Sequence, residues 1–250
     1  MENQSSTNRT AWSYRAYEFW TRSRGTPSEF AKKLLQDPQA NINARYVDLL
    51  IDLPGKRILN ALGSNGRIAV PMALLGAEVH VIDVSEENRR YAMELAESAG
   101  VRLTYEVADF STYHNERYLG YFDIAFSEGG ILHYFRNLDD FFSRLAVFVR
   151  RGGEVIVNDF HPYRKLSDTH IGTDGNYFDD NLHEGPVAYE SEFPESERGS
   201  FPKCLLRFYR IGEIITAIGK NGFCIKEMRE LNKMGMERIP GEFTIVAEKL

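Results

Sequence analysis

Short apolar runs alternate with helix-like stretches between residues 56 and 159, and this alternation restricts the possible fold more than any other feature of the chain. We expect strands over 57–62, 78–83, 102–107, 121–126 and 154–159, and helices over 67–75, 86–99 and 138–150. Strands that alternate with helices of this length form parallel sheets covered by helices on both faces. The sequence therefore predicts an α/β domain.

The N-terminal part has a different character. Residues 1–10 are polar, and we expect a disordered tail there. Helices are expected between residues 11 and 54, including one over 40–52. The aromatic helix that contains Trp12 and Trp20 either packs on the sheet or forms a lid over a binding site.

The regular alternation stops after the fifth expected strand. Residues 160–210 are rich in Gly, Pro and polar side chains, which predicts an insertion that contains a hairpin of 187–193 and 204–209. Residues 223–230 and 242–249 are expected to form a closing antiparallel pair. We therefore expect one domain over 11–250, with a helical cover over 11–54 and a substrate-side insertion over 160–210.

Composition excludes several classes of protein. There are 30 Lys and Arg against 36 Asp and Glu, and the net charge of −6 disfavours binding to nucleic acid through its phosphates. No stretch approaches the roughly 20 apolar residues that cross a bilayer, and the polar N-terminus lacks the apolar core of a signal peptide. The two cysteines cannot form a disulfide framework. We expect a cytoplasmic monomer or homodimer.

Three features stand where expected parallel strands end, which is the edge where open α/β sheets bind ligands. The turn from Gly63 to Gly66 lets backbone approach a ligand before a helix begins. Asp83 ends the second strand, and its carboxylate either accepts hydrogen bonds from a ribose or caps the next helix. Asp109 and Phe110 follow the third strand and offer an acceptor and an apolar wall for an adenine.

With these features in order, the chain resembles the class I S-adenosylmethionine-dependent methyltransferases from about residue 49 to the C-terminus. Residues 58–66 resemble the family's glycine-rich first motif, 81–83 its ribose-binding strand end, 108–110 its adenine-contacting segment and 148–154 its double-glycine turn. The resemblance implies a Rossmann-like, mostly parallel seven-stranded sheet. It also implies S-adenosylmethionine as cofactor and methyl transfer to an oxygen, nitrogen or carbon atom of a small molecule.

The resemblance also implies a set of cofactor-binding residues. They are Asn60, Leu62, Gly63, Ser64, Gly66, Asp83, Val84, Asp109, Phe110, Ser127 and Glu128. The first motif departs from the family pattern, because Asn60 replaces the usual acid and Leu62 and Ser64 replace two glycines. Asn60 can accept a hydrogen bond without the help of a charge. Glu128 either supplies the missing negative charge or interacts with the dipole of the next helix.

Two histidines are candidate catalytic residues. His133 lies where methyltransferases commonly place residues that face the transferred methyl, and His161 follows the fifth strand. A general base is needed only if the nucleophile carries a proton to lose, and the alternative for each is a surface histidine. The spacing of His161, His170 and His183 matches no compact ligand pattern, so we expect no metal.

Two other functions remain open at this point. One is a non-catalytic module that binds S-adenosylmethionine or a nucleotide, which the altered first motif makes plausible. The other is a nicotinamide-dependent oxidoreductase, which Asp83 would suit. The glycines of a dinucleotide-binding G-x-G-x-x-G are missing, however, and this favours the methyltransferase.

Overall fold

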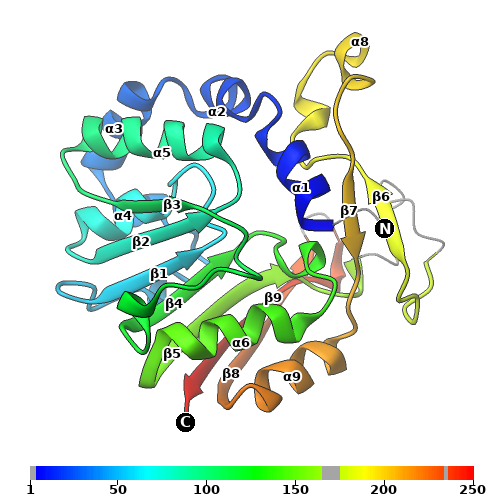
Figure 1. Ribbon diagram of the computed structural model, residues 1–250. Helices are drawn as coiled ribbons and strands as arrows, with labels where there is room; N and C mark the ends of the chain where they lie inside the picture. The colour runs from blue at the N-terminus through cyan, green and yellow to red at the C-terminus, as the bar shows by residue number, and fades with distance from the viewer. Residues whose placement is uncertain (1–3, 165–174, 234–235) are drawn as a thin grey trace.

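The computed structural model describes residues 4–164, 175–233 and 236–250 (Figure 1). A seven-stranded sheet in the order β3-β2-β1-β4-β5-β9-β8 forms its centre. The strands are β1 (Arg57–Ala61), β2 (Glu78–Asp83), β3 (Thr104–Val107), β4 (Phe122–Glu128), β5 (Val149–Phe160), β8 (Phe223–Lys233) and β9 (Met236–Lys249). The pairs among β1 to β5 are parallel, whereas β9 runs antiparallel to both of its neighbours. The expected seven-stranded, mostly parallel sheet is confirmed.

Helices cover both faces of the sheet (Figure 1). Successive side chains of a strand point to opposite faces. Ile58 accordingly packs in one core with residues of α5 (Glu86–Ala99), and Leu59 packs in the other with residues of α6 (Leu138–Phe148). Other helices of the two layers are α2 (Ala16–Arg24), α3 (Pro27–Gln36), α4 (Ala69–Leu74) and α9 (Ile211–Lys220). Burial on both faces explains the continuous apolar runs of the parallel strands.

Local side chains cap two of these helices. Thr26 and Glu29 form a reciprocal capping box at the start of α3, with Pro27 at its first turn. Ser85 accepts a hydrogen bond from the main-chain N–H of Asn88 at the start of α5, and the left-handed Gly100 ends that helix. The helix predicted over 86–99 is therefore confirmed. Among the described residues, no helix is both long and apolar enough to cross a membrane.

The prediction of a disordered tail over 1–10 is wrong for residues 4–10. They belong to α1 (Gln4–Ser13), whose Gln4, Asn8 and Ala11 are buried, and residues 1–3 lie outside the described part. The side-chain amides of Gln4 and Asn8 both donate to the main-chain carbonyl of Leu205. Hydrogen bonds from polar side chains therefore attach this helix to β7 (Cys204–Arg207). Its sequence is for this reason as polar as that of a segment exposed to solvent.

The helix predicted over 40–52 is also wrong. The structure has only two 3-10 turns there, η1 (Gln39–Asn41) and η2 (Val47–Leu49). The side chain of Asn43 accepts a hydrogen bond from the main-chain N–H of Arg45 at 3.0 Å. Such local bonds of an Asn side chain compete with helix formation.

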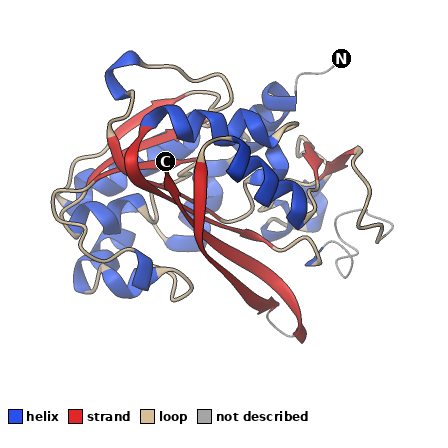
Figure 2. Cartoon of the chain, turned by 90° about the horizontal axis from the view of Figure 1, so that it is seen from below, coloured by secondary structure: helices blue, strands red, loops and turns tan. Residues whose placement is uncertain are grey.

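The insertion after β5 contains a separate hairpin of β6 (Leu182–Gly185) and β7 (Cys204–Arg207). The strand predicted over 187–193 is wrong, because this segment folds into turns around η6 (Glu190–Glu192) before α8 (Glu195–Arg198). Its alternating Val187, Tyr189 and Phe193 are all buried, but in a compact cluster and not in a sheet. Figure 1 shows α1 beside β7, and Figure 2 shows the long β8–β9 hairpin that the sequence predicted. Residues 165–174, with His170, lie outside the described residues.

Candidate functional site

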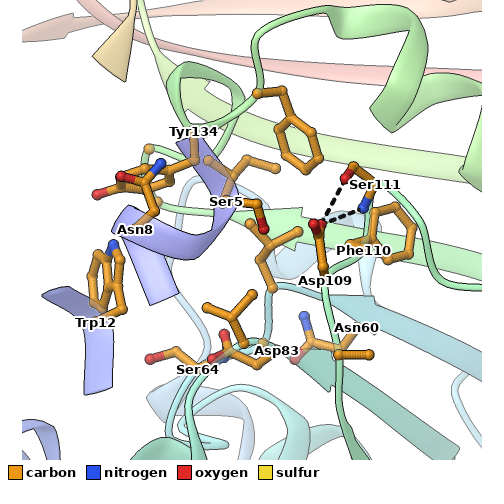
Figure 3. A pocket seen from close by; sticks show the side chains of 18 of the residues that line it. Ser5, Asn8, Trp12, Asn60, Ser64, Asp83, Asp109, Phe110, Ser111 and Tyr134 are labelled. Carbon is orange, nitrogen blue, oxygen red and sulfur yellow. Dashed lines mark hydrogen bonds between the residues drawn. The ribbon is translucent and has the colours of Figure 1, made fainter. Parts of the chain in front are cut away.

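A cavity of about 430 Å³ opens at the carboxyl ends of β1, β2 and β4. The chain runs outward from β1 to β2 and β3 and then returns to β4, so the strand order reverses between β1 and β4. Ligands of open α/β sheets bind at such a reversal. Nine of the eleven residues predicted to hold a cofactor line this first cavity: Asn60, Leu62, Gly63, Ser64, Asp83, Val84, Asp109, Phe110 and Glu128. In Figure 3, Asn8, Trp12 and Tyr134 lie across the cavity from Asp109, Phe110 and Ser111.

The turn after β1 has the left-handed backbone conformation typical of glycine at two positions where this chain has other residues. Leu62 and Ser64 have φ angles of 55° and 51°, in the left-handed region that disfavours L-residues. A Cβ atom on Gly63 would lie 2.5 Å from Oδ1 of Asn60 and 2.7 Å from Cγ1 of Val81. The turn therefore requires Gly63, and tertiary contacts hold its two neighbours in an unfavourable conformation.

Asn60 presents an unsatisfied acceptor beside this turn. Its amide nitrogen donates to the main-chain carbonyl of Phe126 at 3.1 Å. Its Oδ1 is buried and has no hydrogen-bond partner among the described residues. A buried acceptor without a donor costs about 1–3 kcal/mol. Donor groups of a ligand, such as an ammonium, fit this position.

Asp83 is both a structural and a cavity-lining residue. Its side chain is 7% exposed, and its carboxylate accepts hydrogen bonds from the main-chain N–H groups of Ser64 and Ser85, each at 3.0 Å, and from Asn88 at 3.2 Å. Burial raises its pKa despite these bonds. Ser85 and not Asp83 caps α5. A carboxylate has about four lone-pair sites, so Asp83 can still accept from a ligand while it binds Ser85 and Asn88.

Asp109 and Phe110 form the opposite side of the first cavity. Oδ1 of Asp109 accepts from the main-chain N–H and the hydroxyl of Ser111, at 2.9 and 2.7 Å. Phe110 is buried against Phe141, with ring centroids 5.6 Å apart. This side therefore combines a fixed carboxylate with an apolar wall (Figure 3).

Glu128 is not a free carboxylate. It forms an ion pair with the guanidinium of Arg67, and the hydroxyl of Tyr46 donates to it at 3.1 Å. Glu128 does not cap the turn that follows either, because the main-chain N–H groups of Ile131 and Leu132 are bound by another carboxylate, that of Asp159. No local sequence signal pointed to the roles of Arg67, Tyr46 and Asp159, because each depends on a distant partner.

Gly66 and Ser127 have structural positions. A Cβ atom on Gly66 would lie 2.9 Å from Cβ of Ala92, so this glycine lets the turn pack on α5. The hydroxyl of the buried Ser127 donates to the carbonyl of Ala61 and ties β4 to β1. In the part of the chain that the structure describes, neither residue lines the first cavity.

A second cavity of about 750 Å³ adjoins the first. The two share Gly129, Gly130 and Tyr134 in their walls. The rest of the lining includes five aromatic rings, those of His133, Phe160, His161, Phe208 and Tyr209. It also includes four charged residues, Asp159, Arg164, Glu190 and Arg198. A Cβ atom on Gly130 would lie 2.4 Å from Cε2 of Phe160, so the missing side chain leaves room for the ring of Phe160 at this junction of the two cavities.

The two predicted catalytic histidines both line the second cavity but differ in their contacts. Burial lowers the pKa of His133 to about 3, and the charge of Arg164 adds to this effect, so His133 is neutral. His161 accepts a hydrogen bond at Nδ1 from the main-chain N–H of Tyr163, and its Nε2 lies 2.9 Å from Glu230 of β8. His161 thus joins β5 to β8, whereas His133 remains available to a ligand. Within the described ranges, no three His, Cys, Asp or Glu side chains converge as metal ligands.

Comparisons with known proteins agree with this geometry. Residues 58–153 match the family described as "Methyltransferase domain". The fold is similar to that of magnesium protoporphyrin IX methyltransferase from Synechocystis PCC 6803, solved with bound SAH (17% identity, TM-score 0.63, 99% of this chain and 100% of that one). It is also similar to that of an S-adenosylmethionine-dependent methyltransferase from Mesorhizobium loti (19% identity, TM-score 0.64, 84% and 100%). A search of curated proteins gives no match. Residues 58–153 thus match a methyltransferase domain, and the chain as a whole has the fold of S-adenosylmethionine-dependent methyltransferases.

Proposed function

We propose that this methyltransferase acts on a small molecule held in the second cavity. The observation that carries the proposal is the shared wall of Gly129, Gly130 and Tyr134, through which two cavities of different character meet. The second cavity, with about 750 Å³ and a lining rich in rings, has the size and character of sites for small ligands. A flat, largely apolar acceptor fits it best.

The first cavity is the proposed site of S-adenosylmethionine. Asp83 would accept hydrogen bonds from the ribose, and Asp109 and Phe110 would hold the adenine. Oδ1 of Asn60, which has no hydrogen-bond partner among the described residues, would accept a hydrogen bond from the methionine end of the cofactor. The pair of Arg67 and Glu128 offers both signs of charge to a zwitterion there.

Bound S-adenosylmethionine supplies a methyl group on a positively charged sulfur, so the protein mainly has to align the nucleophile and exclude water. The walls of the second cavity would orient the acceptor toward the junction. A ring nitrogen of the neutral His133 can accept a hydrogen bond from the nucleophile. Because its pKa is about 3, His133 is too weak a base to take the proton of the nucleophile, which would leave to water. His161 has no proposed role in proton transfer, since it is held between Tyr163 and Glu230.

Labelled S-adenosylmethionine and a panel of flat, apolar acceptors test the proposal. We expect label in the acceptor and formation of S-adenosylhomocysteine in the same amount. Ala188→Trp is the informative variant, because Ala188 is exposed and lines only the second cavity, so a large ring there takes up the room of the acceptor while leaving Asp83 and Asp109 unchanged. Transfer should fall while S-adenosylhomocysteine still binds. Labelling of proteins or nucleic acids, and of no small molecule, would contradict the proposal.

A further inference from the structure

Gln4 of α1 has a side chain whose orientation is fixed by two carbonyl groups. Its Nε2 donates to the main-chain carbonyl of Leu205 at 2.9 Å and lies 3.5 Å from that of His133. The reverse orientation of the amide would place Oε1 against these two acceptors, which is unfavourable. Oε1 therefore points away from the carbonyl oxygens of Leu205 and His133.

The amide oxygen of Gln4 is buried without a donor. The residue is 8% exposed and lines the first cavity, and Oε1 has no hydrogen-bond partner among the described residues. Burial of an acceptor in this state is unfavourable unless a ligand provides a donor. The position thus indicates a ligand with an N–H or O–H group.

The place of this oxygen shows which part of a ligand it would meet. The carbonyl of His133 next to the Gln4 amide directly precedes Tyr134, one of the three residues shared by the two cavities. His133 itself lines the second cavity. The amide of Gln4 therefore lies beside the junction through which the methyl group would pass.

We propose that Oε1 of Gln4 accepts a hydrogen bond from the N–H or O–H of the acceptor's nucleophile, so that the substrate is a protic amine or hydroxyl compound. The inference rests on the proposed function. In the transfer, a lone pair of the nucleophile bonds to the methyl carbon, and the electrons of the broken C–S bond stay on sulfur. Gln4 aligns the lone pair by binding a hydrogen of the nucleophile before the transfer, and it takes no proton itself. After the transfer the protonated product loses one proton to water; in a hydroxyl compound this is the hydrogen that Gln4 held, so the product first leaves Gln4.

Binding of two cofactor analogues tests this role without knowledge of the acceptor. In sinefungin, a carbon that bears an amine replaces the sulfur with its methyl group, so the amine marks the junction. S-adenosylhomocysteine has no group there. Calorimetry should show that the wild-type protein prefers sinefungin, and that Gln4→Leu and the more isosteric Gln4→Met each lower this preference about tenfold, the scale of a hydrogen bond to a charged group. Their affinity for S-adenosylhomocysteine should change less than threefold.

Asn8→Ala is the matched control. Asn8 also docks α1 through the main chain of Leu205, but both its amide atoms already have partners. This variant should weaken both analogues equally and leave the preference unchanged. The inference would be overturned if the wild-type protein bound both analogues equally well. It would also be overturned if both Gln4 variants kept the preference for sinefungin, or if Asn8→Ala lost that preference to the same extent. Failure of the wild-type protein to bind S-adenosylhomocysteine would instead overturn the proposed function on which it rests.

Discussion

The carboxylate of Glu128 pairs with the guanidinium of Arg67 at the wall of the first cavity, and Tyr46 donates a hydrogen bond to the same carboxylate. The side chain of Glu128 is only 12% exposed and that of Arg67 is 27% exposed. The negative charge missing at Asn60 is therefore present near the turn, but a cation already compensates it. Removal of either member leaves the other as a partly buried charge without a partner.

Glu128→Gln should lower both the stability of the protein and its affinity for S-adenosylhomocysteine. We expect the free energy of unfolding to fall by about 2–4 kcal/mol, because Arg67 keeps its charge in a partly buried place. The double variant with Arg67→Gln should be less destabilised than the sum of the two single variants, with a coupling energy above about 1 kcal/mol. Urea denaturation of the four proteins measures this cycle. If the effects of the two substitutions on the free energy of unfolding were additive, the interaction between Arg67 and Glu128 would contribute nothing to stability.

Asp83→Asn should weaken binding of S-adenosylhomocysteine by about 1–3 kcal/mol, the scale of lost hydrogen bonds to a charged group. The amide oxygen of the variant can still accept from the main chain, whereas its nitrogen would face the N–H groups of Ser64 or Ser85. Calorimetry on the folded variant measures the effect. Ser111→Ala is the control, because it removes a hydrogen bond to Asp109 on the other side of the cavity. Unchanged affinity in Asp83→Asn would limit Asp83 to its structural role.

The sequence predicted the central sheet well because buried parallel strands leave continuous apolar runs, as in residues 155–157 of β5. It also placed Asp83 and Asp109 at one edge, since strand ends follow from the same pattern. Docking of α1 escaped prediction, because Gln4 and Asn8 pack through hydrogen bonds to residue 205, about 200 positions away. The pairing of Arg67 with Glu128 also joins distant residues, which are 61 positions apart. Local periodicity carries no signal for such contacts.

Ser64→Gly should stabilise the protein by about 0.5–1 kcal/mol. Ser64 has a φ of 51°, and glycine adopts this region without the clash that a Cβ atom causes. The change also removes a buried hydroxyl that has no hydrogen-bond partner among the described residues. Ser64→Ala is the control, since it removes the hydroxyl but keeps the Cβ atom. Thermal and urea denaturation should rank the glycine variant above both the alanine variant and the wild-type protein, and equal stability of the two variants would rule out backbone strain.

S-adenosylhomocysteine should slow amide hydrogen exchange in α1 and in β7 together. Gln4 and Asn8 line the first cavity and also bind the main chain of Leu205, so a ligand that holds α1 also holds β7. In Asn8→Ala, protection of β7 should no longer follow binding, while α5 keeps its response through Asp83. Full protection of both segments before the ligand is added would show that α1 is a fixed cover.

Asp159 should make the stability of the protein depend on pH in the opposite sense to most carboxylates. Its Oδ2 accepts from the main-chain N–H groups of Ile131 and Leu132, at 3.0 and 2.8 Å, yet burial raises its pKa from 3.8 to about 6. The folded protein thus binds this proton more tightly than the unfolded chain does. The corresponding stability is fully present below pH 4 and is lost as the pH rises through 6.

Asp159→Asn removes this titration and keeps an acceptor for both N–H groups. The stability of the wild-type protein relative to this variant should therefore fall by about 2–3 kcal/mol between pH 4 and pH 7, as two pKa units imply. Urea denaturation at both pH values measures the difference. Asp123→Asn is the control of opposite sign, because hydrogen bonds from Arg57 and Arg150 lower the pKa of Asp123 despite its partial burial. The stability conferred by Asp123 is lost as the pH falls through that lowered pKa, so the relative stability should not decrease between pH 4 and pH 7. If the stability of the wild-type protein relative to Asp123→Asn fell with pH as much as its stability relative to Asp159→Asn, Asp159 would not be the source of the pH dependence.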